Sequence, residues 1–111
     1  MNEGKIVKIR FIKRYGGAKN HVCIGAVKAE TDNYLVVKGR TFHFGSALPQ
    51  KQGLQKGLPK TRWIPWHQIE LVTELRPDLD WRTEEFALDA SGDIVLRKEL
   101  HGHETAFSRN T

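Results

Sequence analysis

The sequence predicts a mainly β fold in a single domain. Several short segments alternate apolar and polar residues, which is the period of a half-buried strand. These segments are rich in β-branched and aromatic residues and are separated by glycine, asparagine and proline. A chain of 111 residues, 39% of them hydrophobic, suffices for one core and makes a second independent core unexpected.

The first half of the chain predicts three or four strands. Residues 5–13 alternate apolar and basic side chains, as a strand with one buried face does. Residues 21–29 form the next strand, in which Gly25 indicates a bulge or a sharp bend. Residues 33–44 are rich in β-branched and aromatic side chains but are broken by Gly39, so they form either a strand pair or one bent strand.

Residues 45–62 interrupt this pattern. They contain three glycines, two prolines and four basic residues, and no acidic residue. Glycine and proline disfavour a helix, so the segment is predicted to be a long flexible loop. Loops of this length within compact domains tend to be functional or disordered.

The second half predicts a strand, a short turn and a further strand. Pro65 should end a strand because it cannot donate to a ladder, and a one-turn 3₁₀ element over residues 66–68 follows. Residues 69–75 alternate again as a last strand. Residues 80–100 form either a hairpin, closed by a turn with Asx and glycine residues, or a short helix from Asp80.

One stretch carries a resemblance to a known class. The run Trp63-Ile64-Pro65-Trp66-His67-Gln68-Ile69-Glu70-Leu71-Val72 resembles the closing part of SH3-like small β-barrels. There, a strand ends at proline, three residues form a 3₁₀ turn, and a β-branched residue opens the last strand. With residues 34–37, the run also resembles small uncharacterised proteins of phages and other mobile elements. The resemblance covers residues 20–75 and implies an SH3-like barrel of five or six strands.

The resemblance is to the barrel and not to its peptide-binding members. An acidic loop and a strand with paired tyrosines, which peptide-binding SH3 domains carry, have no clear counterpart here. The expected organisation is an SH3-like barrel over residues 1–76 with the inserted loop 45–62. An acidic C-terminal extension over residues 77–111 is not expected to be an independent domain.

The charge is distributed unevenly along the chain. The formal net charge is +5, but residues 1–62 hold 13 basic and 3 acidic side chains, or +10, and residues 63–111 hold 5 and 10, or −5. Such asymmetry indicates either a basic face for a polyanion or attraction between the two halves within the fold.

Several classes of protein are unexpected. A single cysteine, Cys23, excludes an internal disulfide and a multi-cysteine zinc site, and no run of 18 apolar residues predicts a membrane span. The N-terminus lacks the pattern of a signal peptide, so a cytoplasmic setting is expected. No nucleotide-binding, hydrolase or metalloprotease motif occurs, so we expect neither an enzyme nor a cofactor or metal.

The leading hypothesis is a non-enzymatic accessory protein that binds DNA or RNA, mostly without regard to sequence. Cations on glycine-rich loops adapt to a phosphate backbone, and aromatic side chains stack on exposed bases. Trp63 is expected in the core or at the barrel rim, and Trp66 partly exposed. The candidate nucleic-acid-binding residues are Lys13, Arg14, Lys19, Arg40, His43, Lys51, Lys56, Lys60, Arg62 and Trp66.

Two other functions fit the sequence. The chain is alternatively a protein–protein adaptor or inhibitor that docks on a larger enzyme or nucleoprotein complex through exposed aromatic residues and the acidic extension. It is also a candidate homo-oligomer, joined through an exposed strand edge with halves of opposite charge paired.

Overall fold

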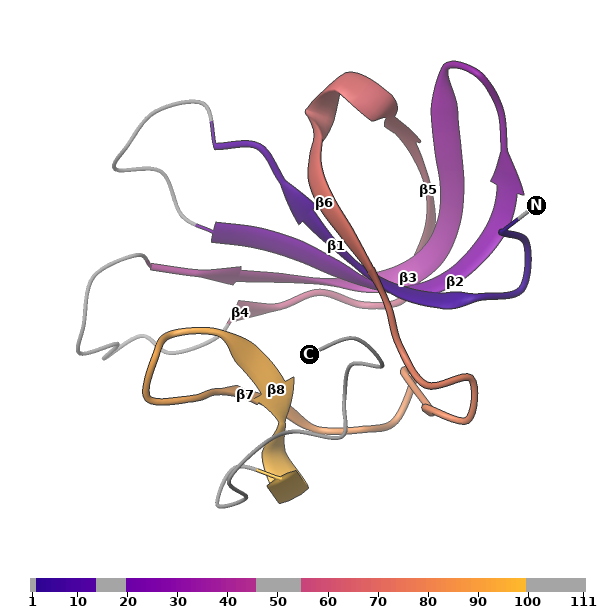
Figure 1. The fold of residues 1–111 in the computed structure, drawn as a ribbon. Helices are drawn as coiled ribbons and strands as arrows, with labels where there is room; N and C mark the ends of the chain where they lie inside the picture. Colours follow the sequence, from indigo (N-terminus) through magenta and orange to yellow (C-terminus); the bar gives the residue numbers. More distant parts are fainter. Residues whose placement is uncertain (1, 14–19, 46–54, 100–111) are drawn as a thin grey trace.

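A curved antiparallel sheet of six strands dominates the fold. The computed structural model describes residues 2–13, 20–45 and 55–99. The sheet is ordered β4-β3-β2-β1-β6, and β5 pairs with another part of β3 (Figure 1). Its strands are β1 (Ile6–Phe11), β2 (Asn20–Glu30), β3 (Tyr34–Phe44), β4 (Gln55–Lys56), β5 (Lys60–Pro65) and β6 (Ile69–Glu74). The prediction of a mainly β fold is confirmed.

The strands β5 and β6 are joined by the predicted 3₁₀ turn. The turn η1 covers Trp66–Gln68, directly after Pro65, whose φ of −62° and ψ of 141° end β5 in an extended conformation. In the described part of the chain, no pairing of β5 with β6 closes the sheet. The sequence therefore predicted the strands and the turn between them, whereas the described sheet is not a closed barrel.

Of the two alternatives for residues 33–44, the structure has the single strand, because β3 runs without interruption through Gly39. Gly39 pairs with Gly25 of β2, and the pairing register continues through both glycines. A Cβ atom on Gly25 would lie 2.2 Å from the carbonyl oxygen of Lys38 and 2.4 Å from the Cα of Gly39. Gly25 thus permits a close approach of two backbones, and the irregularity in β2 lies further on, between Val27 and Ala29.

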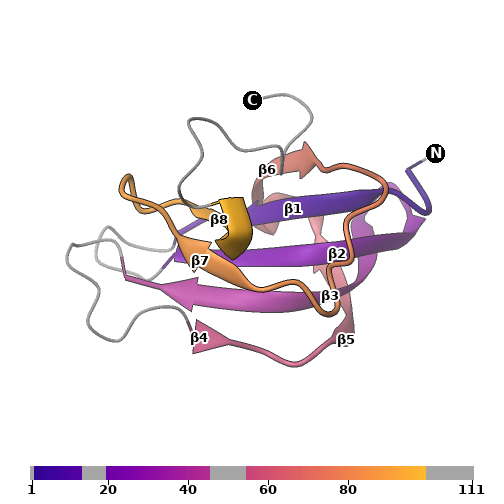
Figure 2. The same ribbon diagram turned by 90° about the horizontal axis from the view of Figure 1, so that it is seen from below.

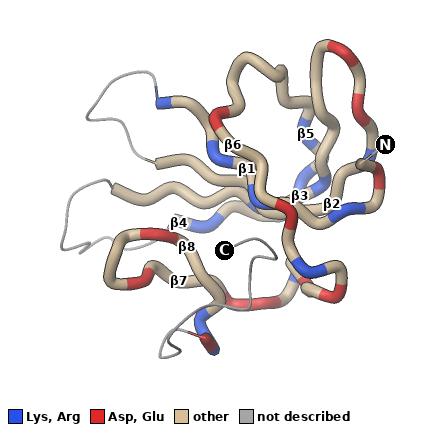
Figure 3. The backbone as a smooth tube through the Cα atoms, viewed as in Figure 1, with Lys and Arg blue, Asp and Glu red and all other residues tan. Residues whose placement is uncertain are grey.

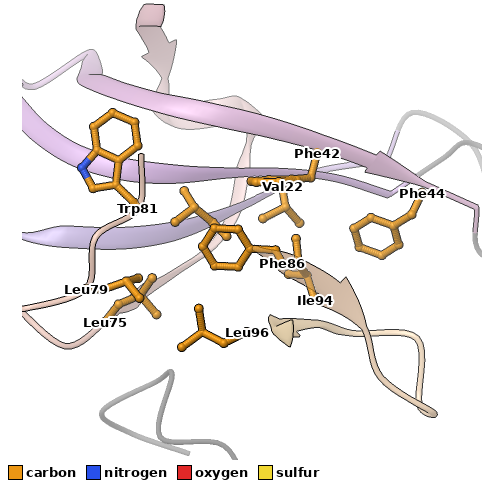
Figure 4. Close-up of a cluster of buried hydrophobic side chains, with 10 residues drawn as sticks. Val22, Phe42, Phe44, Leu75, Leu79, Trp81, Phe86, Ile94 and Leu96 are labelled. Carbon is orange, nitrogen blue, oxygen red and sulfur yellow. The ribbon is translucent and has the colours of Figure 1, made fainter. Parts of the chain in front are cut away.

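Both faces of β2 and β3 are buried. On the inner face, which lies toward β5 and η1, the buried cluster is Val7, Ile9, Cys23, Val27, Leu35, Val37 and Ile64. On the outer face, Val22, Ile24, Phe42 and Phe44 pack against the C-terminal extension (Figure 4). The extension contributes Leu79, Trp81, Phe86, Ile94 and Leu96 to that cluster, and Leu75, just after β6, completes it.

The C-terminal extension contains the predicted hairpin. Strands β7 (Phe86–Leu88) and β8 (Ile94–Leu96) pair in an antiparallel register and are followed by the 3₁₀ turn η2 (Arg97–Glu99). The hairpin lies across the sheet (Figure 2). Its loop is closed by the Asp89 carboxylate, which accepts the amide hydrogens of Ser91 and Asp93.

The alternative of a short helix from Asp80 is wrong. The carbonyl of Asp80 accepts the amide hydrogen of Glu84 at 3.0 Å, which makes one turn, and the chain then enters β7 at Phe86. Phe86 is 1% exposed in the outer cluster, so an extended backbone is needed to place it there. The division of the chain at residue 76 stays a prediction.

Part of the predicted loop over residues 45–62 is β-strand in the structure. Gln55 and Lys56 pair with β3 as the short strand β4, and the chain from Lys60 onward belongs to β5. The amide of Gly57 donates to the carbonyl oxygen of Thr41 at 2.7 Å, which holds this connection against β3. Residues 46–54 of the predicted loop lie outside the described residues.

Arg40 joins the extension to the sheet. Its guanidinium Nη1 donates to the carbonyl oxygens of Trp81 at 3.0 Å and Glu84 at 2.9 Å. The same guanidinium lies 5.2 Å from the ring centre of Phe42 and 5.6 Å from that of Phe86. The Arg40 side chain thus donates hydrogen bonds to carbonyl groups of the segment before β7. It also packs on one ring of the sheet and one ring of the hairpin.

We expect Gly25→Ala to destabilise the fold strongly. Because the new methyl group would collide with backbone atoms rather than a flexible side chain, the cost should be about 3 kcal/mol or more. Urea unfolding measures it. Gly4→Ala is the control, because its Cβ would meet nothing within 4 Å and only the positive φ of 88° costs about 1 kcal/mol. Equal stability of the two variants would contradict this account.

We expect Arg40→Met to loosen the extension. The substitution keeps an unbranched apolar stem but leaves two carbonyl groups without their charged donor, which should cost about 2 kcal/mol. Hydrogen exchange of β7 and β8 should accelerate with the loss of stability. Arg97→Met, at an exposed position in η2, should change neither quantity appreciably.

Candidate nucleic-acid interface

The structure places the predicted basic residues in different surroundings (Figure 3). Lys56 and Lys60 are exposed, whereas Lys13, Arg40 and Arg62 are half-buried. The candidates Arg14, Lys19 and Lys51 lie outside the described residues. The described candidates therefore do not form one uniform basic loop, and their individual contacts decide which of them face solvent.

Two of the predicted arginines are held by contacts within the fold. Arg40 binds the extension, as described above. Arg62 of β5 lies on the inner face, where its Nη2 donates to the Thr41 hydroxyl at 3.4 Å. Its buried Nε has no hydrogen-bond partner among the described residues. Arg40 therefore has a structural role, and we leave it out of the interface.

The acidic extension neutralises part of the basic sheet. The Asp93 carboxylate lies 3.3 Å from Nη2 of Arg10 and 3.8 Å from Nζ of Lys8, both on β1. Burial lowers the pKa of the Lys8 ammonium, and the charge of Asp93 opposes this shift. The charge asymmetry thus acts at least partly within the fold, which is one of the two interpretations that the sequence left open.

The outer face of β3 divides into two parts. From Arg40 to Phe44, the extension covers it. From Tyr34 to Lys38, its side chains are half-buried and neighbour β5, where Val36 lies opposite Trp63. Side chains alternate along a strand, so one strip of this face is made of Tyr34, Val36 and Lys38 of β3 with Thr61 and Trp63 of β5. We call these five residues the tryptophan strip.

Among the phenylalanine, tyrosine and tryptophan side chains that the structure describes, only that of Trp63 is exposed. Its side chain is 68% exposed, which excludes the core, one of the two places expected for it. The indole stacks on Tyr34, with ring centres 5.2 Å apart and planes inclined by 11°. The neighbouring Ile64 is 3% exposed on the inner face, and alternation therefore directs Trp63 outward.

Tyr34 was not among the predicted site residues. The sequence shows it only as the first residue of a β-branched strand after a polar turn. Its place opposite Pro65, diagonal to Trp63, depends on the register between β3 and β5. That register is a long-range property, so local patterns could not have found the pair.

Trp66 is half-buried, as expected, but it serves the fold. Its indole Nε1 donates to the carbonyl oxygen of Thr31 at 2.8 Å, and its amide donates to that of Asn33 at 3.2 Å. These bonds attach η1 to the turn between β2 and β3. The predicted contact of Trp66 with bases therefore stays a prediction without support from its surroundings.

His43 lies on the inner face in a row of three rings. The His21 ring lies between the rings of Phe11 and His43, with ring centres 4.2 Å and 4.0 Å away. Burial, together with the nearby His43 and Arg62, lowers the pKa of His21 to about 4, so its imidazole is neutral at pH 7. Burial likewise raises the pKa of the Cys23 thiol to about 12, which makes it a poor nucleophile.

Within residues 2–13, 20–45 and 55–99, no three histidine, cysteine, aspartate or glutamate side chains are grouped so that they could hold a metal ion. In the same ranges, no helix has the length and apolar character needed to cross a membrane.

Comparison of the chain with models of known families, with curated proteins and with solved structures found no match. The functional argument therefore rests on the geometry of the chain itself.

The pKa of His21 predicts a loss of stability in mild acid. In the unfolded chain the imidazole takes up a proton below about pH 6.5, whereas in the folded chain it does so only near pH 4. Protonation therefore favours unfolding as the pH falls through this window. His21→Phe keeps a ring in the stack and should lower the dependence of the unfolding free energy on pH between about 6.5 and 4.

His67→Phe, at an exposed position in η1, is the matched control and should keep the dependence of the wild type. Urea unfolding at several pH values measures all three chains. If His21→Phe and the wild type lose stability equally across the window, the neutral, half-buried imidazole is not a property of the folded chain.

Proposed function

We propose that the chain binds single-stranded DNA or RNA through the tryptophan strip, as a non-enzymatic accessory protein. The observation that carries the proposal is the exposed Trp63 ring, stacked on Tyr34 beside lysines of the same two strands. Base stacking on aromatic side chains is tolerant of sequence because every base has a π face. The stack on Tyr34 limits the motion of the indole, so that less conformational entropy is lost when a base binds.

The charge of the two strands supports a polyanionic ligand. Strands β3 and β5 contain no acidic residue, and of their four cationic residues Arg40 and Arg62 are engaged within the fold, which leaves Lys38 and Lys60. Lys60 is exposed at the start of β5, and Lys38 lies on the strip itself, opposite Thr61. Lys56 is exposed on the neighbouring β4. Lys38, which shares its face of the sheet with Trp63, is suited to contact the phosphate of a base stacked on Trp63.

An SH3-like architecture is part of this proposal. The chain passes from β1 through β2 and β3 to β5 and returns by η1 to β6, which pairs with β1. This path is the one expected for an SH3-like barrel, and it supports the proposal although β5 and β6 are not paired. The kinship with proteins of phages or other mobile elements, and a cytoplasmic setting, are proposed on the sequence pattern alone.

We expect Trp63→Ala to weaken binding of oligothymidylate or oligouridylate by about tenfold, because stacking of one base contributes about 1–3 kcal/mol. Fluorescence anisotropy of a labelled oligomer measures the affinity. Leu71→Ala is the matched control: Leu71 is 57% exposed on β6, away from the strip, and the variant should bind as the wild type does.

Salt provides a second test of the same surface. Wild-type affinity should fall as salt rises from about 50 to about 200 mM, because bound lysines release counterions. Replacing Lys38 with glutamine should reduce the slope of log affinity against log salt by about 0.7, the value for one phosphate contact. Arg97→Gln, outside the strip, should leave the slope unchanged.

The adaptor function is the second candidate, and a specific observation favours it. Leu71 and Val72 of β6 are 57% and 37% exposed, so this sheet edge offers apolar contacts to another protein. Strands β5 and β6 are also the edges through which homo-oligomers would form. If neither oligothymidylate nor oligouridylate binds the wild type at low salt, the nucleic-acid proposal is wrong. The edges at β5 and β6 then become the surfaces to study.

A further inference from the structure

A pocket lies on the inner side of the sheet, between the end of β1 and the turn η1. Its volume is about 450 Å³, and it is lined by Phe11, Ile12, His21, His67 and Gln68. The amide of Ile12 donates to the carbonyl oxygen of Gln68 at 2.9 Å, which fixes the end of β1 against η1. The pocket therefore has walls from three separate elements of the fold.

One wall of the pocket is formed by Phe11 and His21, two of the three stacked rings described above. The Phe11 and His21 rings are inclined by 23°, and the His21 and His43 rings by 22°, so the three rings stack across three adjacent strands. Stacking of this kind restricts rotation of the His21 side chain, and its Nε2 has no hydrogen-bond partner among the described residues. Because that Nε2 atom is itself buried, the wall presents mainly ring faces to the pocket.

The chemistry of the lining selects an uncharged ligand. Among the residues that the structure describes, the lining comprises two apolar side chains, two imidazoles and one carboxamide, and neither lysine, arginine nor a carboxylate. Gln68 offers both a donor and an acceptor, and the exposed His67 offers a further polar edge. The guanidinium of Arg62 is directed to the Thr41 hydroxyl and does not line the pocket.

We propose that this pocket binds a single uncharged nucleobase, as part of a nucleoside. A planar ring with donors and acceptors along one edge matches a pocket with apolar walls and a carboxamide, and the volume lies in the range of small-molecule sites. The pocket and the tryptophan strip are on opposite faces of the sheet, because His21 and Phe42 point to different sides of their strands. The proposal therefore does not depend on the proposed function.

Titration of the wild type with adenosine, cytidine and uridine tests the proposal. Side-chain resonances of Phe11 and His67 should shift in a saturable way with at least one nucleoside, with dissociation constants at or below the millimolar range. Gln68→Ala, in the exposed part of η1, should weaken that binding by about tenfold, and Trp63→Ala should not change it. Circular dichroism and backbone NMR spectra confirm that each variant is folded.

Two results would overturn the proposal. The first is the absence of saturable shifts with every nucleoside at about 10 mM in the wild type, a result that does not depend on any variant. The second is a saturable shift of the same resonances with inorganic phosphate alone, which would make the pocket an anion site. Loss of nucleoside binding in Trp63→Ala, with Gln68→Ala unaffected, would place the binding on the tryptophan strip and would likewise exclude the pocket.

Discussion

The close approach of β2 and β3 at Gly25 and Gly39 is the constraint on which the rest of the structure depends. A side chain on Gly25 would collide with the backbone of β3, so these two strands can adopt their present path only where both lack a Cβ. Their curvature (Figure 1) lets β5 and η1 cover the inner face while the extension covers part of the outer face. Two buried clusters in a chain of 111 residues follow from this arrangement.

The C-terminal extension covers part of the outer face and thereby determines which cationic side chains stay available to a binding partner. Arg40 binds carbonyl groups of the extension, and Lys8 and Arg10 lie beside Asp93. The net charge therefore overstates the basic surface, because the acidic half of the chain neutralises part of the basic half. The tryptophan strip lies beyond the cover, where Trp63 is exposed on a strand without acidic residues. Fold and proposed function are thus linked through the position of the extension.

Local patterns predicted much of the fold. Alternation predicted β1, β2 and β6, Pro65 predicted the start of η1, and turn residues predicted the hairpin of β7 and β8. Local patterns did not reveal the pairing of Gly25 with Gly39, or the role of Arg40, because both depend on residues distant in the sequence. For the same reason, Trp63 was expected in the core or at the barrel rim, although its position next to Ile64 was a signal that the two point to opposite faces.

Backbone chemical-shift mapping of the isotope-labelled chain during titration with oligothymidylate tests the central claim most directly. That claim is that the extension occupies one part of the outer face and leaves the tryptophan strip to bind nucleic acid. The account predicts that the largest shifts occur at residues 34–38 and 60–65, and that the amides of β7 and β8 stay nearly unchanged. The largest shifts in β7 and β8, or no saturable shift at any residue, would contradict it.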